Sequence, residues 1–116
     1  SRETEQKIRD DSEVLSNDTS FHATLMEKIF LITDYIRHRD FWNEQIEQMY
    51  VNAEGEFELV PLVGNHIIIF GDATDIDEKF EKLFTFYKNG LNKTGWNHYS
   101  AINLKYKDQV VCTKKL

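Results

Sequence analysis

Four consecutive apolar residues near the middle of the chain, residues 67–70 (IIIF), constrain the fold more than any other stretch. Gly64 and Asn65 are turn-forming residues before this run, and Gly71 and Asp72 close it. A short apolar run between turn residues is typical of a strand that is covered on both faces. The sequence therefore predicts a buried strand here, which the rest of the chain must surround.

Two further strands are predicted before this run. Residues 45–51 place apolar groups on both faces, and residues 57–60 resume a strand pattern after the turn at residues 52–55. In that turn Gly55 can adopt a positive φ, and Pro61 marks the end of the second strand or an edge position. The three strands together form a predicted antiparallel meander.

An amphipathic helix is predicted ahead of the meander. Asp18 or Ser20 can cap its start, and it continues to about His38. Its apolar residues recur at steps of three and four and form one stripe: Phe21, Leu25, Ile29, Ile32 and Ile36. Residues 1–18 have few apolar side chains and are expected to be a flexible or truncated lead-in, so residues 19–116 form the predicted domain.

A second amphipathic helix is predicted after the meander. Asp75 and Glu78 have the spacing of a capping box, and Asn89-Gly90 is a typical left-handed stop. The apolar stripe between them is regular: Ile76, Phe80, Leu83, Phe84 and Tyr87. Because one stripe is apolar on each helix, both helices are expected to pack on the sheet.

The last part of the chain has the pattern of a β-hairpin. Ile102, Leu104 and Tyr106 alternate with polar residues and predict one buried face. A turn at residues 107–109 leads into a final predicted strand at residues 110–113. The predicted fold class is therefore α+β, with two helices packed on one face of a mostly antiparallel sheet that ends in a β-hairpin.

Charge and composition exclude several functions for these 116 residues. The formal net charge is −6, which argues against nucleic-acid binding because that requires a concentrated basic surface. Lysines gather near the end of the chain, but no arginine accompanies them: Lys105, Lys107, Lys114 and Lys115. No run of about 20 apolar residues and no signal-peptide pattern is present.

Catalytic and metal motifs are also missing from the sequence. Cys112 is the only cysteine, and its β-rich surroundings favour a small apolar strand residue over a nucleophile. His38 lies four residues after Asp34. The two side chains could bind a metal, or the histidine could act as a base, or both could simply lie at a solvated helix end. No cofactor and no metal site are predicted. One alternative stays open, a small-ligand-binding or hydrolytic domain that uses histidines such as His22, His38 and His66 with neighbouring carboxylates.

The final predicted strand is the best candidate for a binding surface. It is short, rich in β-formers and followed by Lys114-Lys115. The lysines could simply protect an ordinary edge from aggregation, or the edge could accept a strand from a partner. The edge could also pair with a second copy of itself and give a weak edge-to-edge dimer.

An ordered series of segments resembles the β-domain of FtsQ/DivIB, the bacterial cell-division proteins, in the form found in Bacteroidetes. The resemblance extends from about Phe21 to Lys115 and is carried by these segments: 45–51 (QIEQMYV), 58–61 (ELVP), 67–72 (IIIFGD), 79–83 (KFEKL), 86–87 (FY) and 102–106 (INLKY) followed by 109–111 (QVV). Family members have a single transmembrane helix and a POTRA domain, which are not recognisable in this chain. The resemblance implies that this chain is one part of a longer protein.

The resemblance also implies a function. Such proteins are non-catalytic scaffolds of the divisome at the septum, anchored in the inner membrane with this domain in the periplasm. They join FtsB and FtsL, and the partner is expected to add a strand by β-augmentation along the last strand. Carried onto this sequence, the partner-binding residues are Lys105, Tyr106, Asp108, Gln109, Val110, Val111, Cys112 and Thr113.

Overall fold

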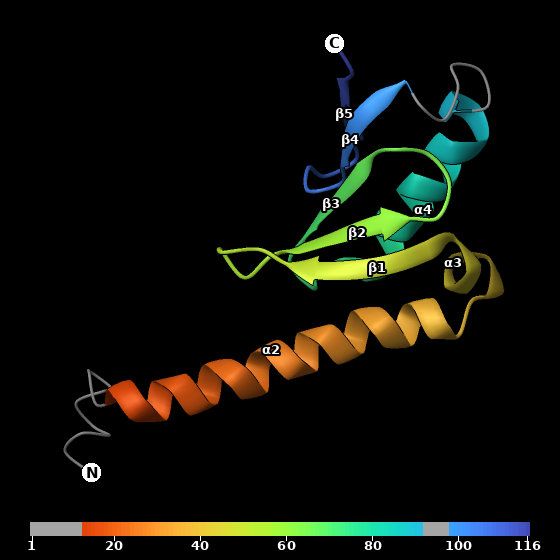
Figure 1. Cartoon of the computed structure of the whole chain (residues 1–116). Coiled ribbons are helices and arrows are strands. Elements are labelled where there is room, and N and C mark those ends of the chain that lie inside the picture. The colour runs from red at the N-terminus through yellow and green to blue at the C-terminus, as the bar shows by residue number, and fades with distance from the viewer. Residues whose placement is uncertain (1–12, 92–97) are drawn as a thin grey trace. The chain divides into compact units, whose positions relative to one another are not determined.

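The computed structural model describes residues 13–91 and 98–116 (Figure 1). Of the lead-in predicted at residues 1–18, residues 1–12 lie outside the described residues, and residues 13–18 are the start of α2. The chain divides into two compact units, residues 1–31 and 32–116. The elements follow in this order: α2 (Glu13–Arg37), α3 (Asp40–Gln45), β1 (Ile46–Val51), β2 (Phe57–Pro61), β3 (Ile67–Gly71), α4 (Ile76–Phe86), the π-helical turn η1 (Tyr87–Leu91), β4 (Tyr99–Asn103) and β5 (Val111–Lys114).

The first unit contains most of α2. This helix begins at Glu13, earlier than the predicted cap at Asp18 or Ser20. No glycine or proline occurs between Glu13 and Arg37, so nothing in the local sequence interrupts the helix. Met26 and Phe30 are exposed on this part of the helix.

The second unit holds a five-stranded sheet with the strands in sequence order, β1-β2-β3-β4-β5. Neighbouring strands are antiparallel except β3 and β4, which are parallel and connected through α4 (Figure 1). A parallel pair needs a crossover connection, and the predicted second helix supplies it. This arrangement confirms the predicted α+β class, the mostly antiparallel sheet and the closing strand pair.

The core lies between one face of the sheet and the helices. Phe80 on α4 is its centre, with ring centroids 5.1 Å from Phe70, 5.1 Å from Trp42 and 4.7 Å from Tyr35. The fully buried core side chains come from every layer of the second unit: Ile32, Phe57, Leu59, Ile68, Phe70, Phe80, Leu83, Ile102 and Leu104. Burial of Phe80, Leu83 and Tyr87 confirms most of the predicted stripe on α4, although Phe84 is 39% exposed. In the stripe of the first helix Ile32 and Ile36 are buried, whereas the side chain of Phe21 lies outside the described part.

The prediction that residues 67–70 are covered on both faces is wrong. Ile68 and Phe70 are fully buried, whereas Ile67 is 36% exposed and Ile69 is half-buried. The face of Ile68 and Phe70 is the one that packs against α4, where Phe70 contacts Phe80. The apolar run therefore reflects the central position of β3 in the sheet, where strands flank it on both sides.

Both ends of α4 differ from the predicted caps. Asp75 adopts a left-handed conformation (φ 52°), and its side chain makes no capping hydrogen bond. Its carbonyl instead accepts a hydrogen bond from the Lys79 N–H at 2.9 Å. At the other end the chain continues through Asn89-Gly90 as the π-helical turn. Tyr87 is buried there and hydrogen-bonds His66 Nε2 at 3.1 Å, a tertiary contact that outweighs the local stop signal.

The buried face predicted for Ile102, Leu104 and Tyr106 is correct only in part. Ile102 and Leu104 are fully buried, but Tyr106 is 53% exposed. The strand ends at Asn103, whose Oδ1 accepts a hydrogen bond from the Lys105 N–H at 2.8 Å. This side-chain bond competes with the sheet ladder and turns the chain out of the strand before Tyr106.

Candidate functional site

Strand β5 forms one edge of the sheet. It pairs with β4 along Val111–Lys114, and no other described residue pairs with it on the opposite side. An edge strand presents backbone N–H and C=O groups that can pair with another chain. The predicted position of the last strand at a sheet edge is therefore the position found in the structure.

The backbone hydrogen bonds show which peptide groups of β5 face outward. Lys115 N–H donates to His98 O at 3.1 Å, and Thr113 O accepts a bond from Ser100 Oγ at 3.3 Å, so both residues face β4. Peptide groups alternate in direction along an antiparallel strand. The N–H and C=O of Cys112 and Lys114 therefore point to the free side of β5.

A tight turn precedes this edge. Asp108 adopts a left-handed conformation (φ 58°), which aspartate tolerates better than most residues, and Gln109 N–H donates to Tyr106 O at 3.3 Å. The turn predicted at residues 107–109 is therefore present. It brings the chain back beside β4 and fixes where β5 begins.

Lys82 on α4 holds this turn in place. Its ammonium donates to three carbonyl oxygens: Leu104 O at 3.0 Å, Tyr106 O at 2.5 Å and Gln109 O at 3.0 Å. An ammonium has three donors, so all of them are committed to the backbone of the turn. Burial lowers the pKa of Lys82, while the charges of Asp108 and Asp75 act in the opposite direction.

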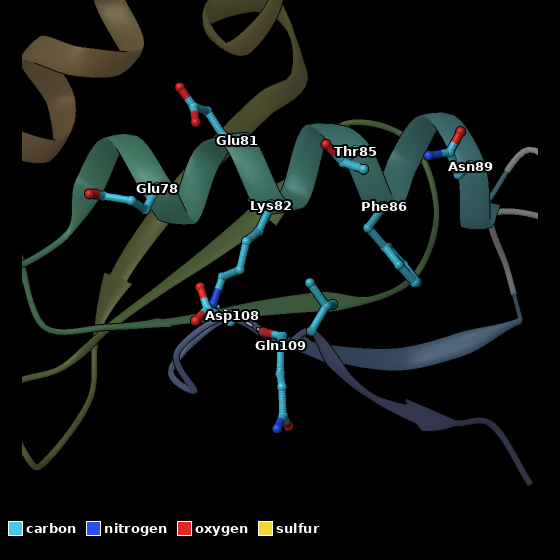
Figure 2. A pocket seen from close by; sticks show the side chains of 9 residues that line it. Glu78, Glu81, Lys82, Thr85, Phe86, Asn89, Asp108 and Gln109 are labelled. Atoms are coloured by element: carbon cyan, nitrogen blue, oxygen red, sulfur yellow. Dashed lines mark hydrogen bonds between the residues drawn. The ribbon is translucent and has the colours of Figure 1, made fainter.

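A groove lies between α4 and the start of β5. It has a volume of about 650 Å³ and is lined from α4 by Glu78, Glu81, Lys82, Thr85 and Phe86, from the π-helical turn by Asn89, and from the chain before β5 by Asp108, Gln109 and Val110. Figure 2 shows Lys82 and Phe86 pointing from α4 toward the turn, with Glu81 on the side of α4 away from it. The groove adjoins the free edge, so both belong to one surface.

Lys105, a predicted site residue after β4, lies apart from that edge. Lys105 Nζ forms an ion pair with Glu56 Oε1 at 2.9 Å, and this hydrogen bond raises the pKa of Lys105. A methyl group added to Gly71 would lie 2.8 Å from Lys105 Cγ, so the lysine stem rests on that glycine. The contact with Glu56 directs the charge of Lys105 toward the start of β2.

The predicted residues on β5 occupy both faces of the strand. Val111 and Thr113 are exposed, whereas Cys112 is half-buried opposite Ile102. Burial raises the pKa of the Cys112 thiol, as expected of a residue that packs against the core. Val110 is also half-buried and points into the groove wall with Phe86.

The histidines are dispersed in the structure. His38 follows the end of α2 and lies beside Asp34, with Nδ1 3.3 Å from Asp34 Oδ1, and Arg37 bonds the same oxygen at 3.1 Å. His66 contacts Tyr87 in the core, and the side chain of His22 is outside the described part. Among the described residues no three His, Cys, Asp or Glu side chains come together as metal ligands.

Sequence reasoning missed the contribution of α4 to this surface. Lys82 lies beside the apolar stripe of the helix and looks like an ordinary solvated lysine in the sequence. Only the tertiary structure brings it to the turn, 27 residues further along the chain from Lys82 to Gln109. The sequence predicts only a capping role for Glu78, and Glu81 is inconspicuous because a helix surface normally carries such charges.

Comparison with known proteins agrees with this architecture. A family model described as FtsQ/DivIB, C-terminal related, matches residues 5–113. The chain belongs to the FtsQ/DivIB C-terminal-related family. This membership indicates a role in cell division, as the resemblance in the sequence implied. No match was found among curated proteins.

FtsQ/DivIB proteins are membrane-anchored division proteins that act with protein partners. Across residues 13–91 and 98–116, no helix has the length and apolar character needed to cross a bilayer. The family match includes α4 and strands β1 to β4, and it extends into β5. The candidate binding surface is the free edge of β5 with the adjoining groove.

Proposed function

We propose that this chain is a non-catalytic scaffold domain of the bacterial divisome, and that it binds FtsB/FtsL-like partners by strand addition at β5. In this proposal the full-length protein is anchored in the inner membrane by a single helix, with this domain in the periplasm. Family membership supports the cell-division role. The free edge supports the binding mode.

The observation that carries the proposal is the outward direction of the Cys112 and Lys114 peptide groups. A partner strand would bond to them without disturbing the β4–β5 ladder, which uses the groups of Val111 and Thr113. The added strand gains backbone hydrogen bonds, and its alternate side chains meet the two faces of the sheet. One of those faces opens into the groove beside α4.

The turn before β5 gives this edge a defined shape. Lys82 bonds three turn carbonyls, and the left-handed Asp108 sets the entry of the chain into the strand. A partner therefore meets an edge whose register is already set, which lowers the entropy lost on binding. Tyr106 is exposed next to this turn and is available to the same partner.

The test is a single proline substitution. Proline removes a backbone N–H, and Cys112 is the suitable position because its N–H faces outward. Proline at Val111 would instead break a bond to β4. We expect Cys112→Pro to weaken binding of the periplasmic segment of an FtsB-like protein by about 100-fold, measured by isothermal titration calorimetry.

The matched control is Cys112→Ala, which removes the thiol but keeps the N–H. We expect this variant to bind the segment with an affinity within about threefold of the unmodified chain. Circular dichroism and thermal unfolding establish that both variants are folded. Unchanged binding by folded Cys112→Pro, or no binding of the segment by the unmodified chain, would refute strand addition at β5.

A further inference from the structure

The groove beside β5 has a charge pattern that favours one kind of partner. Three carboxylates line it, from Glu78, Glu81 and Asp108, against a single ammonium from Lys82. Glu78 and Glu81 accept no hydrogen bond and form no ion pair within the described residues. The polar groups that the groove can offer to a ligand are therefore mainly acidic.

Lys82 has no donor left for a ligand, and its positive charge already interacts with Asp108 and Asp75. Its three donors are all bonded to carbonyl oxygens of Leu104, Tyr106 and Gln109. A carboxylate on a partner would have to replace one of those bonds and would face the acidic rim. A lysine or arginine on a partner would meet unpaired carboxylates, and arginine could bind one of them bidentately.

The groove is also divided along its length. Glu78 lies toward the start of α4 and Asp108 lies in the turn, with Glu81 on the outer side of α4 (Figure 2). Phe86 lies one helical turn beyond Lys82 and beside Tyr99, with ring centroids 5.8 Å apart. Val110 adds a second apolar side chain to the wall. One end of the groove is therefore acidic, and the other end is apolar.

The spacing of these groups suits an extended chain. Side chains four residues apart on α4, such as Glu78, Lys82 and Phe86, lie about 6 Å apart along the helix axis. Side chains two residues apart on a strand lie on one face and are about 6.6 Å apart. Successive helix-facing residues of a strand added to β5 would thus meet successive turns of α4.

Charges at the other end of β5 define the order of the partner's residues. Lys114 and Lys115 are exposed where the strand ends, whereas Asp108 is exposed where it is about to begin. A basic partner residue is attracted to the Asp108 end and repelled at the Lys114 end. The acidic and basic ends therefore select one register for an added strand.

We propose that the occupant of this groove is a partner strand that carries a lysine or arginine beside the acidic end and an apolar side chain two or four residues away, over Phe86 and Val110. This inference rests on the proposed strand addition at β5 and specifies the chemistry of the partner. A second copy of this chain fits less well, because its formal net charge of −6 opposes an acidic groove.

The first experiment uses a random peptide library displayed on phage as the probe. The library is selected against the 116-residue chain, with the variant Glu78→Lys/Glu81→Lys as counter-selection. We expect enriched peptides in which a basic residue stands two or four positions from an aliphatic or aromatic one. Enrichment of acidic peptides, of peptides that bind the variant equally well, or of none at all would overturn the inference.

The second experiment uses the FtsB-like periplasmic segment. We expect Glu78→Lys/Glu81→Lys to weaken its binding about tenfold and to reduce the dependence of affinity on salt. The control, Asp77→Lys/Glu47→Lys, changes exposed carboxylates outside the groove. Each Glu→Lys or Asp→Lys exchange adds two units of charge, so both double variants have a formal net charge of −2 instead of −6. We expect the control to bind within about threefold of the unmodified chain.

The outcomes separate the inference from the proposed function. If the groove variant binds normally while Cys112→Pro does not, strand addition stands and the charge preference falls. If the segment never binds, strand addition falls, and the peptide selection alone decides the groove chemistry. Sedimentation of the chain at high concentration tests whether a second copy occupies the groove. Self-association that Glu78→Lys/Glu81→Lys abolishes would assign the groove to a second copy and overturn the inference.

Discussion

The two edges of the sheet differ in what surrounds them. β1 and β5 are both edge strands, with one neighbour each in the described sheet. The cavity beside β1 has a volume of about 250 Å³ and is lined partly by Thr33, Ile36 and Arg37 at the end of α2. The groove beside β5 is about 650 Å³, and α4 forms most of its wall.

This difference shows that an unpaired edge is not enough to define a docking site. The side chains of a strand added to β1 would need the space that the end of α2 occupies. A strand added to β5 would find a groove with separate acidic and apolar ends. The space on the helix side of each edge, more than the backbone groups, therefore distinguishes β5 from β1.

Proline at matched positions gives the largest expected effect. Asn52 N–H donates to Glu56 O, so the peptide group of Val51 points to the free side of β1, as that of Cys112 does on β5. We expect Val51→Pro to leave the affinity for the FtsB-like segment within about twofold, against about 100-fold for Cys112→Pro. If calorimetry shows that Val51→Pro and Cys112→Pro lose the same affinity, β5 is not distinguished from β1 as the binding edge.

The turns at the two edges are expected to differ in their contribution to stability. Lys82→Met removes three hydrogen bonds to turn carbonyls and should lower the free energy of unfolding by about 1.5 kcal/mol, since the ammonium is partly solvated. Asn52→Ala removes a side chain that accepts bonds from Glu54 N–H and Glu56 N–H, and should cost about 1 kcal/mol.

Urea denaturation measures both values. The comparison gains a second readout from partner binding, because Lys82 shapes the turn before β5 and Asn52 shapes the turn after β1. Lys82→Met should weaken binding of the FtsB-like segment, whereas Asn52→Ala should not. A binding loss confined to Asn52→Ala would contradict the assignment of the site to β5.

Two glycines allow a similar comparison with a smaller effect. Gly55 (φ 82°) and Gly71 (φ 87°) both adopt conformations that disfavour other residues. An added methyl group has open space at Gly55 but meets Lys105 Cγ at Gly71. Gly55→Ala should therefore lower the free energy of unfolding by about 1 kcal/mol through backbone strain alone, and Gly71→Ala should lower it further. Thermal unfolding of the two variants side by side tests the order.

The smallest effect concerns the thiol at the β5 edge. Burial raises the pKa of Cys112 from its ordinary value of 9.0, so less thiolate is present at any pH below that value than in an unstructured peptide. Alkylation by iodoacetamide should be slower than for the unfolded chain and should accelerate as the pH rises above 9.0. The bound FtsB-like segment should slow alkylation of Cys112 further. An alkylation rate that the segment does not change would mean that it binds away from β5.

Much of the fold could be predicted from local patterns. The strand patterns at residues 45–51 and 57–60, and the turn at Gly55, correspond to elements of the structure because turn chemistry and apolar spacing act over a few residues. The helix caps were less predictable. Asp75 and Asn89-Gly90 have suitable sequences, but the packing of Tyr87 and the left-handed Asp75 override them.

The candidate site was predictable in part. The last strand, its turn and its place in a sheet were evident from residues 102–113. Tyr106 was assigned to the wrong environment, because the bond from Lys105 N–H to Asn103 Oδ1 ends the strand early. The groove was absent from the prediction, since its walls come from α4 and from the turn before β5, which are far apart in the sequence.

The sequence alone determined most of the segments that become helices and strands, the acidic balance of the chain and the β-rich character of its end, because these depend on composition and short-range spacing. The short helix α3 and the π-helical turn were not among the predicted elements. The tertiary structure decided which strands lie at the edges, which peptide groups of β5 face outward, and that Lys82 bonds the turn while Glu78 and Glu81 remain unpaired. Those properties depend on contacts between residues distant in the chain, which only packing on a common core brings together.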